Sequence, residues 1–84
     1  MSRHDKLLAK ILEGKADASI RFSDLRLFLQ RLGYVERIRG SHHLFRHSEF
    51  GGRLNLQRDG SQAKPYQVRQ VRTAIIKHGL GGKP

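Results

Sequence analysis

In the first third of the chain, apolar residues recur every three or four positions, which is the spacing of amphipathic helices. One such stripe predicts a helix over residues 4–13 that ends at Gly14. A second stripe begins after Ser23, the expected N-cap, and ends at Gly33, with Phe22 before the cap in the position of a hydrophobic staple. Two helices joined by a polar connector are therefore predicted. Their stripes consist of Leu7, Leu8, Ile11 and Leu12, then of Leu25, Phe28, Leu29 and Leu32.

The middle of the chain changes to the composition and alternation of β-strands. Residues 34–39 and 42–47 are rich in strand formers and flank a turn at Gly40-Ser41. Residues 53–57 alternate between polar and apolar side chains, which predicts a third strand. The loops between these segments are short, so an antiparallel meander is expected, followed by a loop over residues 58–62.

Helical spacing returns in the last third. Pro65 is expected near the first turn of a helix, where a missing N–H costs nothing, and Gly79 is expected to end it. Val68, Val71 and Ile75 form its buried stripe. The predicted order α-α-β-β-β-α describes one α+β domain over residues 1–84, with a three-stranded antiparallel sheet and helices packed on one face. Residues 81–84 are expected to be a disordered tail.

Because the helices cover only one face of this sheet, strand parity assigns side chains to a covered and an open face. If Phe45 points to the helices, His43 and His47 do so too, while His42 points the other way. The assignment depends on Phe45 rather than Leu44 pointing inward, because a one-residue slip reverses it. The open face is then expected to carry His42, Arg46, Arg53, Asn55 and Gln57.

The charge of the chain indicates which class of partner it binds. The formal net charge is +10, and residues 37–84 carry ten Lys and Arg against two acidic residues. Polyanions are the expected partners, and an acidic protein partner is a compatible alternative. The chain has no cysteine, no apolar stretch of membrane-spanning length and no apolar segment of a signal peptide, so a cytoplasmic protein without a membrane role is expected.

Histidine and arginine on one face suit RNA cleavage without a metal. A histidine titrates near neutrality and can take the proton of a 2′-hydroxyl, after which the oxygen attacks its own phosphate. Arg46, Arg53 or Lys64 could stabilise the developing charge. The leaving group must also gain a proton, and His43, His47 or a cation-bound water is a candidate donor. A metal or other cofactor is not expected, because acidic pairs are missing from the basic half and adjacent strand histidines point to opposite faces.

Several segments together resemble the HicA (YcfA-like) toxins. They are Gly40-Ser41-His42 followed by Leu44-Phe45, then Asn55-Leu56-Gln57, then the run from Lys64-Pro65-Tyr66 to Arg72. The resemblance covers residues 23–80 and makes residues 1–20 an extra helix and connector. It implies a double-stranded-RNA-binding-domain-like fold, metal-free mRNA interferase activity and a HicB antitoxin as partner. It also aligns His42 with the catalytic histidine of the family.

One departure limits what the resemblance implies. Many members carry a Pro-x-His element after the third strand, whereas this chain has Gln57-Arg58-Asp59-Gly60 there. A catalytic role for a second histidine is therefore not carried over.

These observations lead to the hypothesis of an mRNA endoribonuclease toxin with His42 as general base. A non-catalytic module for double-stranded RNA is the main alternative, and a protein that docks an acidic partner is another. Ser41 is expected to hold the turn beside His42. The residues expected to contact RNA or its phosphates are Arg39, Ser41, Arg46, Arg53, Lys64, Arg69 and Arg72.

Overall fold

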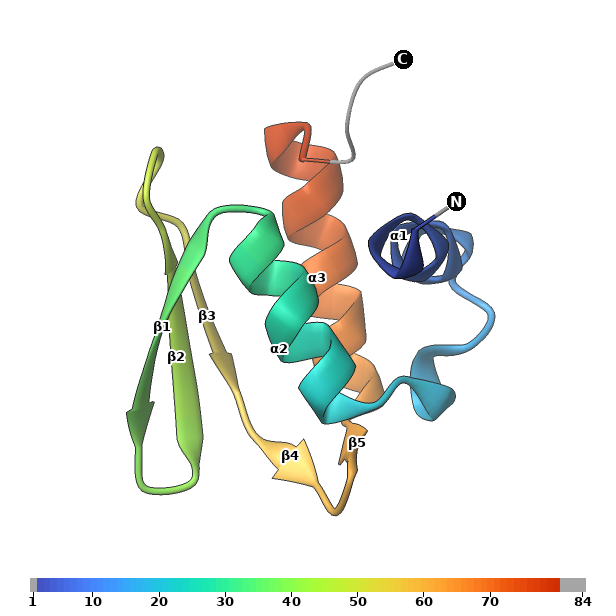
Figure 1. Cartoon of the computed structure of the whole chain (residues 1–84), viewed down its shortest axis with the longest axis horizontal. Coiled ribbons are helices and arrows are strands. Elements are labelled where there is room, and N and C mark those ends of the chain that lie inside the picture. Colours follow the sequence, from blue (N-terminus) through green and yellow to red (C-terminus); the bar gives the residue numbers. More distant parts are fainter. Residues whose placement is uncertain (1, 81–84) are drawn as a thin grey trace.

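The sheet lies on one side of the molecule and the α-helices lie on the other, in a computed structural model that describes residues 2–80 (Figure 1). The expected α+β class and the order α-α-β-β-β-α of the main elements are confirmed. The helices are α1 (Arg3–Glu13), α2 (Phe22–Arg31) and α3 (Pro65–His78), with a 3-10 turn η1 (Asp17–Ser19) between the first two. The sheet consists of β1 (Tyr34–Arg39), β2 (His42–His47) and β3 (Arg53–Leu56), and a small hairpin of β4 (Arg58–Asp59) and β5 (Gln62–Ala63) follows it.

The three main strands form the expected antiparallel meander in the order β1-β2-β3. The turn between β1 and β2 contains only Gly40 and Ser41, and Gly40 has a φ of 58°, which glycine adopts without steric cost. In the register, Arg39 lies opposite His42 and Phe45 lies opposite Leu54. Phe45 is buried against the helices, so the predicted parity of β2 is confirmed.

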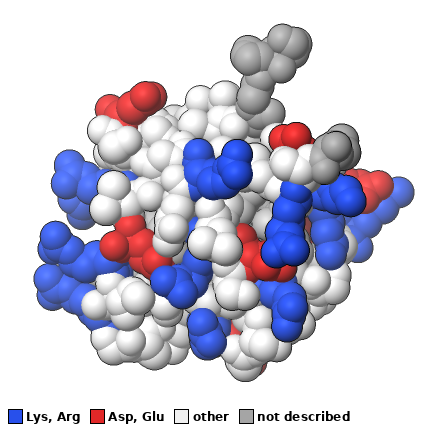
Figure 2. All heavy atoms as spheres, viewed as in Figure 1, with Lys and Arg blue, Asp and Glu red and all other residues white. Residues whose placement is uncertain are grey.

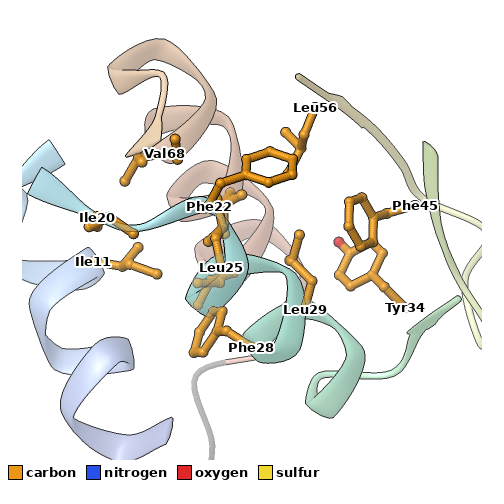
Figure 3. Close-up of a cluster of buried hydrophobic side chains, with 13 residues drawn as sticks. Ile11, Ile20, Phe22, Leu25, Phe28, Leu29, Tyr34, Phe45, Leu56 and Val68 are labelled. Carbon is orange, nitrogen blue, oxygen red and sulfur yellow. The ribbon is translucent and has the colours of Figure 1, made fainter. Parts of the chain in front are cut away.

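One apolar core joins the sheet to all three helices, and Figure 3 shows ten of its residues by name. Phe45 and Leu56 come from the sheet, whereas Ile11 and Ile20 come from the segment before α2. Ile11 and Ile20 are 0% and 1% exposed, so α1 and the connector after it each contribute a side chain to the core. Burying side chains of this size contributes about 1.5–3 kcal/mol each to folding.

The start of α2 differs from the prediction. The N-cap is Arg21, not Ser23, and no side chain caps the helix. Phe22, expected as a staple residue before the helix, is its first residue. The backbone N–H of Phe22 donates a hydrogen bond of 3.0 Å to the carbonyl oxygen of Ser61. Because this segment pairs with a distant part of the chain, tertiary contacts set the helix start and override the local capping preference of Ser23.

The segment expected as a loop over residues 58–62 is also different, since most of it belongs to the β4-β5 hairpin. The hairpin turns at Gly60, which has a φ of 64°. The N–H of Ala63 donates to the carbonyl oxygen of Ile20 at 2.8 Å, and Arg21 bridges to Gln62. Strands of two residues show no alternation in a sequence, which is why the prediction missed them.

The helix ends follow the sequence signals elsewhere. Pro65 is the first residue of α3, and Gly14 and Gly79 end α1 and α3 in the left-handed conformation. The predicted tail at residues 81–84 lies outside the described residues. Among residues 2–80, no helix combines the length and apolar character required to cross a membrane.

Candidate functional site

The face of the sheet that the helices leave uncovered gathers arginine side chains from all three strands. Alternation along the strands places Arg37 and Arg39 of β1, Arg46 of β2 and Arg53 of β3 on this side, which we name the open face. All four arginines are exposed. They line a broad hollow of about 1080 Å³ over the strands. In Figure 2, Lys and Arg lie on the side of the molecule where the sheet is and also over the side where α1 is. The open face also carries Val35, His42, Leu44 and Asn55.

His42 is exposed at the start of β2, directly after the Gly40-Ser41 turn. Its cross-strand neighbour is Arg39, so a guanidinium lies on the same face beside the imidazole. The Nδ1 atom of His42 lies 3.3 Å from the Oδ1 atom of Asn55 on β3. Since an amide oxygen only accepts, Nδ1 is the donor, and Nε2 is the nitrogen that can accept a proton.

The turn that carries His42 is tied to the end of β3. The Nε2–H of Gln57 donates a hydrogen bond of 3.2 Å to the Oγ of Ser41. Through this contact Ser41 links the turn to the residue after β3. Ser41 is also exposed, so its hydroxyl lies at the same end of the sheet as His42.

His43 and His47 lie on the covered side of the sheet and have partners there. His43 is 8% exposed, and its Nδ1 donates to the Oε2 of Glu36 at 2.6 Å. His47 is 4% exposed, and its Nε2 donates to the carbonyl oxygen of Leu32 at 2.7 Å. Because the sheet separates both imidazoles from His42, neither can serve as the second proton-transfer group that the sequence left open. That expectation is wrong for both residues.

The carboxylate nearest to these strands does not neutralise the open face. Glu36 points to the helices, where Arg26 and Gln30 of α2 and His43 of β2 bind its two oxygens. The Arg26 guanidinium, the largest influence, lowers the pKa of Glu36 from 4.5 to about 2, and burial opposes this change. The acidic residue that lines the open hollow is Glu49, from the loop after β2.

Arg46 and Arg53 are directly opposed across β2 and β3 on the open face. Like charges in this position destabilise a sheet by a few tenths of a kcal/mol or more. A bound anion between the two guanidiniums would remove this repulsion.

The structure does not bring Lys64, Arg69 and Arg72 to this face, because they belong to the start and body of α3 in the helical layer. Arg72 donates two hydrogen bonds to the carboxylate of Asp17, at 3.0 and 3.1 Å, and one to the carbonyl oxygen of Ile11. The bond from Arg72 lowers the pKa of Asp17. Arg72 thus joins α3 to the N-terminal segment. The expected phosphate ligands that share the open face are Arg39, Arg46 and Arg53, and Ser41 lies in the turn at one end of it.

Two residues of the open face were not among the ligands predicted from the sequence. Arg37 shares the parity of Arg39 on β1, a signal the sequence carries once β1 is assigned. Asn55 was expected on the open face, but its hydrogen bond to His42 depends on the β2-β3 register. Among residues 2–80, no group of three or more His, Cys, Asp or Glu side chains is arranged to hold a metal ion.

Comparisons with family models, with curated proteins and with solved structures found no match to this chain.

Proposed function

We propose that this protein is a metal-independent endoribonuclease that cleaves mRNA in the cytoplasm, as the toxin partner of a HicB-like antitoxin. The observation that carries the proposal is the position of His42. It is exposed on the open face with four arginines, whereas the other two strand histidines are buried behind the sheet. The resemblance to the HicA toxins selects the same imidazole. A double-stranded-RNA-binding-domain-like fold, with α2, the three strands and α3 as its elements, is part of this proposal.

In the proposed reaction, Nε2 of His42 removes the proton from a ribose 2′-hydroxyl. The 2′-oxygen then attacks the adjacent phosphorus, and the bond from phosphorus to the 5′-oxygen of the next nucleotide breaks. The products are a 2′,3′-cyclic phosphate and a free 5′-hydroxyl. Asn55 holds the Nδ1–H of His42 so that Nε2 faces the substrate. Arg39, on the neighbouring strand, is placed to stabilise negative charge on the phosphorane.

The 5′-oxygen that leaves must gain a proton. His43 and His47 are separated from it by the sheet, so a water molecule polarised by the arginines of the open face is the donor in this proposal. Such a donor is weaker than an imidazolium, and we therefore expect departure of the 5′-oxygen to limit the rate.

The remaining arginines are placed to bind the RNA strand away from the reacting phosphate. Arg46 lies four residues from His42 along β2, which corresponds to about 13 Å in an extended strand. RNA that follows β2 would then place a flanking phosphate between Arg46 and Arg53. The proposed antitoxin is acidic, covers His42 and occupies these guanidiniums.

The proposal is tested by incubating the purified protein with an end-labelled single-stranded RNA in excess EDTA. We expect shorter products whose amount grows with time and with protein concentration. The non-catalytic module for double-stranded RNA predicts salt-dependent binding without any cleavage product. Binding alone, at protein concentrations well above the dissociation constant, would therefore reject the endoribonuclease in favour of that alternative.

Replacing Asn55 tests how His42 is positioned. In Asn55→Asp, a carboxylate stabilises the protonated imidazole, so the pH at which cleavage reaches half its maximal rate should move upward by about one unit. Asn55→Ala should lower the rate about tenfold without this upward displacement. The measurement is a single-turnover cleavage profile from pH 5 to 9. An unchanged profile in Asn55→Asp would show that Asn55 does not contact the catalytic imidazole.

Neutralising the opposed arginines tests the RNA path. The double variant Arg46→Gln/Arg53→Gln removes two expected phosphate contacts, so the slope of log K against log salt should fall by about 1.4 for single-stranded RNA. The matched control is Arg69→Gln, which removes one exposed charge from α3 and should leave the slope unchanged. Filter binding at several salt concentrations gives both slopes. If the slope falls more in Arg69→Gln than in the double variant, the RNA binds the helical layer instead of the open face.

A further inference from the structure

A second hollow lies between α1 and α2, on the helical side of the molecule. Its volume is about 320 Å³, and its apolar lining comes from Leu7 of α1 and from Leu27 and Phe28 of α2. Leu27 is 59% exposed, although it lies in the middle of a helix. His4 stacks on the ring of Phe28 with 4.7 Å between ring centroids, which extends this flat apolar surface. We name this hollow the α1-α2 groove.

The rim of the α1-α2 groove is strongly basic. Four Lys and Arg side chains line it against a single carboxylate, that of Asp24. None of the three ion pairs found within residues 2–80 involves the rim cations. An apolar floor with a cationic rim favours a ligand that is apolar on one side and anionic on its edges. The rim cations are Arg3, Lys6, Lys10 and Arg31.

A second copy of this chain does not have the matching charge. The chain carries a formal net charge of +10, and each of its three α-helices has more Lys and Arg than Asp and Glu. A helix of another copy would therefore bring further cations to a rim that already holds four. Charge repulsion opposes this arrangement, and the charge complementarity points to a different, acidic protein.

We infer that the α1-α2 groove binds an acidic amphipathic helix of a partner protein. Leucine-type side chains at positions i, i+4 and i+7 of that helix enter the apolar floor, as in other helix-in-groove complexes. Glutamates on either side of this stripe meet the four rim cations. Because α2 and α3 lie between α1 and the sheet, the bound helix leaves the open face accessible to RNA (Figure 1). The inference does not depend on the nuclease activity proposed above.

The test measures binding of the full-length protein to a fluorescein-labelled 16-residue peptide by fluorescence anisotropy. The peptide carries leucines along one helical face and glutamates elsewhere, and a control peptide has the same composition with the leucines spread around the helix. At physiological salt, we expect the amphipathic peptide to bind at least tenfold more tightly than the control. This comparison separates groove binding from general attraction to a basic protein, since both peptides have the same charge.

Variants then locate the site. Leu27→Asp should weaken binding of the amphipathic peptide at least tenfold, and Lys6→Glu should weaken it severalfold. The matched control is Ile76→Asp, which replaces another exposed aliphatic residue, 68% exposed, on α3 outside the groove. It should bind as the wild type does. All three substituted side chains are exposed, and circular dichroism verifies that the variants fold.

Four outcomes would overturn the inference. The first is equal binding of the two peptides, and the second is an unchanged affinity in Leu27→Asp. The third is binding of dodecanoate in a Leu27-dependent manner without a preference between the peptides, which would make the groove a site for a small anionic amphiphile. Self-association of the wild type that Leu27→Asp abolishes would assign the groove to a second copy and would equally contradict an acidic partner.

Discussion

His42→Ala is expected to lower the single-turnover rate of RNA cleavage by a factor of about 10² to 10⁴, the range that a general base contributes. The affinity for RNA should change less than threefold, because the arginines of the open face remain. The fold should be intact, since His42 is exposed and its contact with Asn55 lies at the surface. Growth inhibition on expression should disappear together with cleavage.

A matched control for this variant is His78→Ala, which removes another exposed imidazole, at the end of α3. This variant should retain the wild-type cleavage rate. If His42→Ala also cleaves at the wild-type rate, His42 is not the general base and the proposed reaction is wrong. If both variants lose activity equally, the loss does not come from the position of His42 on the open face.

The second large effect is expected at the buried carboxylate of Glu36, which joins β1 to α2 and β2. Its side chain is 7% exposed and accepts hydrogen bonds from Arg26, Gln30 and His43. Glu36→Gln removes the negative charge that these cationic and polar groups surround. We expect the free energy of unfolding at pH 7 to fall by about 3 kcal/mol, as is typical when one partner of a buried ion pair is removed.

The same carboxylate makes stability depend on pH. The pKa of Glu36 is about 2 in the folded protein and near 4.5 in the unfolded chain. A lowered pKa stabilises the folded state fully above the unfolded value and loses this contribution as pH falls from about 4.5 toward 2. A shift of this size corresponds to about 3 kcal/mol. The difference in stability between wild type and Glu36→Gln should therefore shrink steadily below pH 4.5.

Urea denaturation at pH 7, 4 and 3 measures this effect. The control is Glu13→Gln, which replaces an exposed carboxylate at the end of α1 and should change stability by less than 0.5 kcal/mol at each pH. A stability difference for Glu36→Gln that stays constant from pH 7 to 3 would show that the charge of Glu36 is not what stabilises the fold.

The sequence predicted those parts of the fold that local patterns determine. The strand bounds at residues 34–39 and 42–47, the Pro65 helix start and the Gly14 and Gly79 helix ends agree with the structure. Strand parity also placed His42 and Asn55 on the open face. In each case, the pattern of the residue and its close neighbours along the chain is sufficient to assign its conformation.

Interactions between distant segments leave no local pattern in the sequence. The helix start at Phe22 and the β4-β5 hairpin depend on pairing between residues near 20 and near 62. The same limit applies to charged residues. Arg72 has the pattern of a solvated helix face, yet it binds Asp17, 55 positions earlier. Glu36 likewise finds partners on α2 and β2 that no local spacing indicates.

The central claim is that His42 activates the 2′-hydroxyl of the RNA for cleavage without a metal ion. The most direct test is mass spectrometry of the product ends, after incubation of the same RNA in excess EDTA with wild type and with His42→Ala, purified in parallel. The account predicts 2′,3′-cyclic phosphate and 5′-hydroxyl ends from the wild type and no products from the variant. Other ends from the wild type, or the same products from both proteins, would contradict it.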